Sequence, residues 1–149
     1  MMDSIPNLWP KDINVKIVSP RAILRAQVAP LEKSTQGLLS VEVITRPLDA
    51  SDEVIHELDI VARPLSNLRI GILNVVHNKK NVYPARFEGF YVDDLGMVKD
   101  PETEPLSASS ETEFMKLLGE ILGSRSIRAL IESLLIQIND TGLAFASKS

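Results

Sequence analysis

The chain has 149 residues, of which 44% are hydrophobic and 24% charged, with a formal net charge of −4 at pH 7. This length suits one domain with a single substantial core, and we expect residues 1–149 to form one domain. The acidic balance argues against nucleic acid as the main partner, because domains that neutralise phosphates are usually basic. The absence of cysteine excludes disulfides, thiol nucleophiles and cysteine-ligated zinc.

The beginning of the chain shows no targeting pattern. Its first twenty residues lack both the basic start and the apolar stretch of a signal peptide. No later run approaches the ~20 apolar residues of a membrane span. We therefore expect a soluble, cytoplasmic protein outside the membrane. Residues 1–18, which contain Pro6, Trp9 and Pro10, are predicted to be irregular.

A helix is predicted over residues 19–37. Ser19 can cap it, Pro20 suits the first helical position, and Gly37 suits the residue past its end. Pro30 removes a backbone donor and crowds the preceding turn. The pattern therefore predicts either a kink or two short helices that meet at Ala29-Pro30.

Four strands are predicted next, because the hydrophobic period changes to two. The segment 67–77 is apolar at nearly every position, which is typical of a strand covered on both faces. The links between the segments are short and carry turn residues, as in an antiparallel meander. The four segments span residues 38–46, 54–63, 67–77 and 84–92.

Residues 93–113 are acidic and aperiodic, and they are predicted to form a long surface loop. Helical spacing then returns in two segments, the first ending at Gly123 and the second capped by Ser124. Residues 140–149 are predicted to be a tail. The fold class predicted by these elements is α+β: a four-stranded antiparallel meander with one N-terminal helix and two C-terminal helices packed on it.

His77 stands at the end of the third predicted strand, directly before Asn78 and two lysines. A catalytic histidine needs a partner that holds its tautomer, and no acid adjacent in the sequence provides one. We interpret His77 as a polar strand end, dispensable for both stability and activity.

Glu57 and Asp59 are two residues apart on a predicted strand, so their carboxylates share a face and could bind a divalent cation. The alternative is a ladder of opposite charges on an exposed face, in which Arg69 and Arg86 pair with acids of neighbouring strands. We favour the ladder and expect no bound metal and no cofactor.

Two further groups of residues are candidates for an interaction surface. Lys79 and Lys80 lie at a predicted turn, with Tyr83 close behind. Leu130 and Leu134 lie on the apolar stripe of the last helix, which serves either the core of the chain itself or a partner.

The sequence contains neither a phosphate-binding glycine loop nor a GxSxG or HExxH motif. We therefore expect a non-catalytic protein–protein interaction module, with a protein partner or another copy of itself. Such a module would be an accessory, assembly or toxin-neutralising component of a bacterial system. The alternative is a metal-assisted phosphodiester hydrolase that uses Glu57, Asp59 and a histidine.

Overall fold

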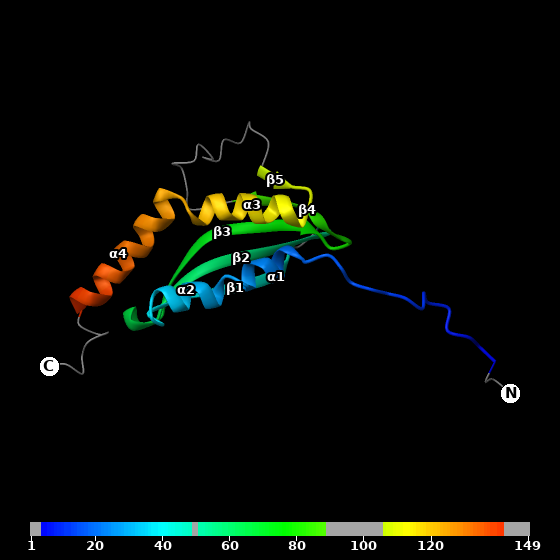
Figure 1. Cartoon of the computed structure of the whole chain (residues 1–149), viewed down its shortest axis with the longest axis horizontal. Helices are drawn as coiled ribbons and strands as arrows, with labels where there is room; N and C mark the ends of the chain where they lie inside the picture. The colour runs from blue at the N-terminus through cyan, green and yellow to red at the C-terminus, as the bar shows by residue number, and fades with distance from the viewer. Residues whose placement is uncertain (1–3, 49–50, 89–105, 142–149) are drawn as a thin grey trace.

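The computed structural model describes residues 4–48, 51–88 and 106–141. Within them, helices pack against one five-stranded antiparallel sheet, which makes the fold α+β as predicted (Figure 1). The elements in chain order are α1 (Pro20–Arg25), α2 (Val28–Ser34), β1 (Leu39–Pro47), β2 (Glu53–Ala62), the 3-10 helix η1 (Arg63–Leu65), β3 (Leu68–Asn78), β4 (Asn81–Glu88), β5 (Leu106–Ala108), α3 (Glu111–Leu122) and α4 (Arg125–Thr141).

The strands follow one another across the sheet in chain order, so the predicted meander is confirmed. The predicted number of strands is wrong, because β5 adds a fifth. It lies inside the segment 93–113, which was predicted to be a loop, and α3 begins there as well. Leu106 and Ala108 pair with Phe87 and Ala85 of β4. A strand of three residues is too short to show a period of its own. Residues 89–105, which include the end of the predicted fourth strand, lie outside the described residues.

The N-terminal helical region consists of two short helices, but they do not meet at Ala29-Pro30. The break falls at Ala26 and Gln27. Pro30 is the third residue of α2, in the first turn, where a backbone N–H has no partner within the helix. The ring of a helical proline clashes with the carbonyl four residues earlier, which belongs here to Ala26. The proline therefore ends α1 and is accommodated in α2.

The two C-terminal helices are confirmed. Ser110 caps α3 by accepting a hydrogen bond from the Glu113 amide (3.2 Å), and Ser124 likewise accepts one from the Ile127 amide (3.3 Å). Gly123 separates the helices. Helix α4 continues to Thr141, so it includes the first two residues of the predicted tail; residues 142–149 lie outside the described residues.

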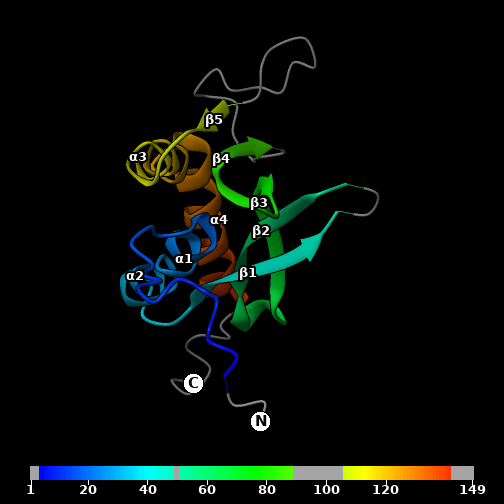
Figure 2. The same cartoon turned by 90° about the vertical axis from the view of Figure 1, so that its right-hand side faces the viewer.

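The helices lie on one face of the sheet, and the core lies between (Figure 2). Alternation along β2 turns Leu58 and Ile60 toward this face, where they line an apolar pocket together with Leu31 of α2 and Ile127 of α4. The pocket has a volume of about 240 Å³, and its lining includes no titratable side chain. It therefore provides no group for acid–base chemistry.

The opposite face of the sheet carries the charged side chains. Glu57 and Asp59 alternate with the core residues of β2 and therefore point away from the helices. In the described ranges, no helix is both long enough and apolar enough to cross a membrane.

Leu134 offers a test of the core, since its side chain is 1% exposed. Leu134→Ala is expected to lower the free energy of unfolding by ~2–5 kcal/mol, the usual effect of truncating a core leucine. The matched control is Ile136→Ala on the same helix, where the side chain is 60% exposed and the change should stay below ~0.5 kcal/mol. Urea unfolding measures both. Equal losses in the two variants would contradict the assigned helix face.

Candidate functional site

The most exposed apolar side chains of the described residues gather in one segment, residues 4–18, which we call the arm. It extends away from the helices and the sheet (Figure 1). Its Trp9 is 75% exposed and its Val15 is 85% exposed. Burial of such side chains is favourable by roughly 25 cal/mol per Å² of apolar surface. An apolar segment left in water in this way makes the arm the candidate interaction site of the described residues. The large apolar residues of the arm are Ile5, Leu8, Trp9, Ile13, Val15, Ile17 and Val18.

The second half of the arm has the side-chain pattern of a strand. Ile13, Val15 and Ile17 alternate with Asn14 and Lys16, so an extended backbone would place the apolar residues on one face. The sequence interpretation missed this pattern, because it treated residues 1–18 as irregular on account of their prolines. The signal was present between residues 13 and 17, after the last of those prolines.

The arm is held at its root, Val18. Tyr83 of β4 donates its hydroxyl hydrogen to the Val18 carbonyl (2.8 Å). The Val18 amide donates to Glu111 Oε2 at the start of α3 (3.0 Å). Burial raises the pKa of Tyr83 to about 12, so its hydroxyl stays protonated and able to donate. Both anchors come from the β4 side of the sheet, and they fix the point from which the arm leaves.

The other predicted interaction residues fall into two groups. Lys79 and Lys80 are exposed at the turn between β3 and β4, in the same hairpin as Tyr83. The structure thus brings Tyr83 to the arm with the lysines nearby in the chain. Leu130 and Leu134 belong to the buried core of the chain and do not join that surface.

His77 is not a solvated strand end. Its side chain is 8% exposed, and its Nε2 lies 2.7 Å from Nε2 of His56 on β2. Its removal would leave a buried polar group of His56 without a partner, so we now expect His77→Ala to lower stability. Sequence reasoning missed the pair because the two residues are 21 positions apart and meet diagonally across two strands.

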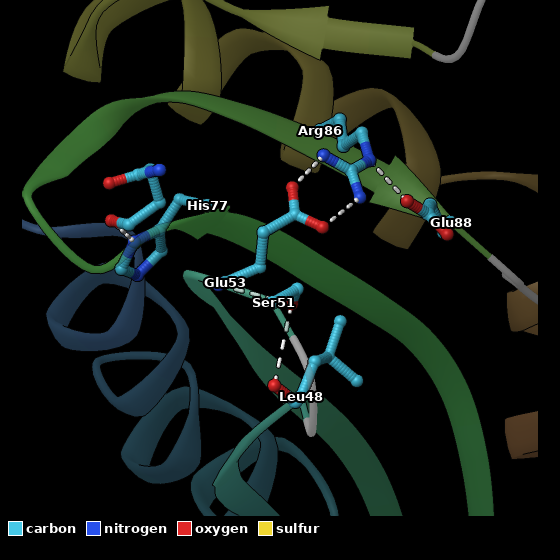
Figure 3. Close-up of polar contacts among 7 residues, drawn as sticks. Leu48, Ser51, Glu53, His77, Arg86 and Glu88 are labelled. Carbon is cyan, nitrogen blue, oxygen red and sulfur yellow. Dashed lines mark hydrogen bonds and ion pairs between the residues drawn. The ribbon is translucent and has the colours of Figure 1, made fainter.

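One arrangement of protons on the two rings satisfies all of their hydrogen bonds. The Asn78 carbonyl can only accept, so His77 Nδ1 carries a hydrogen and donates to it (2.9 Å; Figure 3). His77 Nε2 must then accept from His56 Nε2. His56 Nδ1 in turn accepts from the Thr45 hydroxyl (2.8 Å), whose oxygen accepts from Arg21 Nε (3.1 Å).

Burial, together with the neighbouring His77 ring and the Arg21 guanidinium, lowers the pKa of His56 to about 4. The pair links β1, β2 and β3.

The charged face carries the predicted ladder, with different pairings. Arg69 contacts Glu42 and lies 3.6 Å from Asp59, while Glu57 pairs with Arg46 (3.6 Å). Arg86 belongs to a separate group. It bridges Glu53 of β2 (3.0 Å) and Glu88 of β4, as Figure 3 shows.

Asp59 departs from the prediction of an exposed ladder, because it is 1% exposed. Its neighbour across the strands is Gly71, which has no side chain to hold the carboxylate away. A Cβ at Gly71 would lie 3.3 Å from Asp59 Oδ1 and 3.4 Å from Glu57 Oε2, so both carboxylates converge over this glycine. Burial raises the pKa of Asp59 to about 7, and the adjacent Glu57 carboxylate contributes to the rise.

The approach of the Glu57 and Asp59 carboxylates also accounts for the unpaired oxygen of Asp59. Among the described residues, Asp59 Oδ1 and Asn74 Oδ1 are buried without a hydrogen-bond partner. A proton on Asp59 turns Oδ1 into a donor toward Glu57, so the two carboxyl groups can share one hydrogen. The acid pair is thus suited to holding a proton near neutral pH.

The residues of the hydrolase alternative do not converge. Glu57 and Asp59 lie on the charged face, whereas His56 and His77 lie on the helix-covered face of the same sheet. Across the described parts of the chain, no group of three or more histidine or acidic residues is placed to hold a metal ion.

Comparisons with protein-family models, with curated proteins and with solved structures each found no match to this chain.

The two buried titratable groups should have opposite effects on stability as the pH falls from 7.5 to 5. His56 binds a proton in the unfolded chain (pKa 6.5) but not in the fold (about 4), so acid destabilises. Asp59 holds its proton in the fold (about 7) but not in the unfolded chain (3.8), so acid stabilises. Each effect amounts to about 2–3 kcal/mol over this range. The free energy of unfolding of the wild type should therefore be nearly constant between pH 7.5 and pH 5.

Single variants should reveal how each of the two groups changes the free energy of unfolding with pH. Asp59→Asn leaves only the effect of His56, so its free energy of unfolding should fall as the pH falls to 5. His56→Gln leaves only the effect of Asp59, so its free energy of unfolding should rise over the same range. Urea unfolding at several pH values measures both. Glu53, whose pKa Arg86 lowers from 4.5, titrates below this range and does not interfere. Parallel pH profiles for the two variants would contradict the assignment.

Proposed function

We propose that the protein is a non-catalytic protein–protein interaction module that binds its partner through the arm. The observation that carries this proposal is the run of apolar side chains exposed to water in residues 4–18, whereas the helices and strands of the described residues bury a shared core. Accessory, assembly and toxin-neutralising proteins all use modules of this kind.

The arm is suited to strand addition. An extended segment that joins the edge of a sheet gains main-chain hydrogen bonds, and its alternate side chains fill pockets on one face. Ile13, Val15 and Ile17 supply such a face, and Lys16 between them remains available to water or to acidic groups. Before binding, the backbone of residues 13–17 makes no hydrogen bond within the described part of the chain.

The fixed root favours binding. A segment tethered at a defined point loses less freedom on binding than a free one, which improves affinity. Tyr83 and Glu111 provide that tether, and Lys79 and Lys80 add positive charge in the hairpin that carries Tyr83. We include Tyr83 and the two lysines in the proposed interaction surface for this reason.

The double variant Val15→Asp/Ile17→Asp tests this function. Both side chains are exposed, so stability should change by less than ~0.5 kcal/mol per site. Binding should be lost, because two charges would be buried against the partner. Affinity capture from cells that express the protein, analysed by mass spectrometry, compares the wild type with the variant.

The matched control is Asn14→Asp, a charge placed on the opposite face of the same strand. It should retain the partner captured by the wild type. A partner set that is identical for the wild type and the double variant would show that the arm is not the binding element.

Tyr83→Phe tests the root separately. It removes the hydroxyl donor to the Val18 carbonyl and should cost about 1 kcal/mol of stability. The root of the arm should then loosen, and trypsin should cut faster after Lys16 than in the wild type. An unchanged rate of cleavage would mean that this hydrogen bond does not hold the arm.

A further inference from the structure

Strand β1 forms an edge of the sheet, and its outward backbone groups can be identified. The Leu48 amide donates to the Glu53 carbonyl (3.0 Å), so this pair faces inward between β1 and β2. Because inward and outward pairs alternate in an antiparallel ladder, Leu39, Val41, Val43 and Thr45 turn their N–H and C=O groups outward. Leu39 confirms this, since its amide and carbonyl both bond to the Thr35 hydroxyl (3.1 and 3.2 Å).

The remaining outward groups have no such partner. No hydrogen bond to the backbone of Val41, Val43 or Thr45 on this side comes from the described part of the chain. Pro47 follows in the same series and has no N–H, so it limits how far another strand can extend. The edge therefore offers a short row of free donors and acceptors between Val41 and Thr45.

Residues 13–17 of the arm cannot lie along this edge within their own copy while the root is held. Val18 is tied to Tyr83 of β4 and to Glu111 of α3. Strand β4 lies three strands away from β1, which corresponds to about 14 Å. Residues 13–17 would have to cross the sheet instead of running along β1. An arm anchored beside β4 and an open edge at β1 are therefore suited to pairing between two molecules.

We propose that residues 13–17 of one copy add to the outer edge of β1 in a second copy, and that the second copy returns the same contact. This rests on the proposed function, and it names the partner as another copy of the chain. A reciprocal exchange fills both open edges and closes the assembly at two copies.

The side chains of the two strands are complementary. On the helix-covered face, Ile13, Val15 and Ile17 would continue the apolar row of β1, of which Val43 is only half-buried. On the opposite face, the alternation places Lys16 on the side of Glu42, whose carboxylate is 48% exposed. Apolar side chains therefore meet apolar ones, and a cation meets an acid.

Two variants separate the arm from the edge. Val43→Pro removes the outward amide of β1 without removing a hydrogen bond to β2, and Val15→Asp/Ile17→Asp alters the arm. Analytical ultracentrifugation of the full chain should show a dimer for the wild type. Each variant should raise the dimer dissociation constant by ~100-fold or more, with an unchanged circular dichroism spectrum.

A mixture of the arm variant with the edge variant provides the control. The arm variant keeps an intact edge, and the edge variant keeps an intact arm, so a one-to-one mixture should form a heterodimer held by one arm–edge contact. A dimer that survives Val43→Pro, or a mixture that stays monomeric, would overturn the proposal.

The two proposals can fail separately. A wild-type chain that is monomeric at every concentration up to its solubility limit would overturn exchange between copies. If the arm variant then still loses a partner that the wild type captures, the proposed function stands and the partner is a different protein. If it loses none, both proposals fail.

Discussion

The structure depends on one constraint: its sheet is covered by helices on one face only. The period of two along β2 then sorts neighbouring residues into different environments. Leu58 and Ile60 enter the core, whereas Glu57 and Asp59 face the opposite side, where arginines pair with them or lie nearby. The same alternation separates the histidines from the carboxylates. A catalytic site that needs both kinds of group is therefore not assembled on this sheet.

Each face also contains a buried group with its own requirement for protons. His56 has to stay neutral to accept from Thr45 and donate to His77. Asp59 favours its protonated form, because the Glu57 carboxylate is adjacent and water is excluded. Both groups lie on β2 within three residues of each other, so the central part of the sheet combines opposite responses to acid. We expect this balance to keep the stability of the fold nearly constant between pH 7.5 and pH 5, although each group alone would change it.

The sequence predicted the parts whose pattern is local and repeated. The strands that became β1 to β4, the helices α3 and α4, and the burial of Leu134 follow from hydrophobic period and capping residues. Three-dimensional pairing was not predictable in the same way. The His56–His77 contact depends on strand register, and β5 is too short to show a period. The burial of Asp59 depends on the glycine opposite, which the register alone identifies.

We propose that residues 13–17 of the arm become a strand when they add to the edge of β1 in a second copy. Amide hydrogen exchange, measured at low and at high protein concentration, tests it most directly. The account predicts that amides in residues 13–17 become protected as concentration rises, together with the outward amides of Val41, Val43 and Thr45. Rapid exchange of the arm at every concentration, in a chain that nevertheless dimerises, would contradict it.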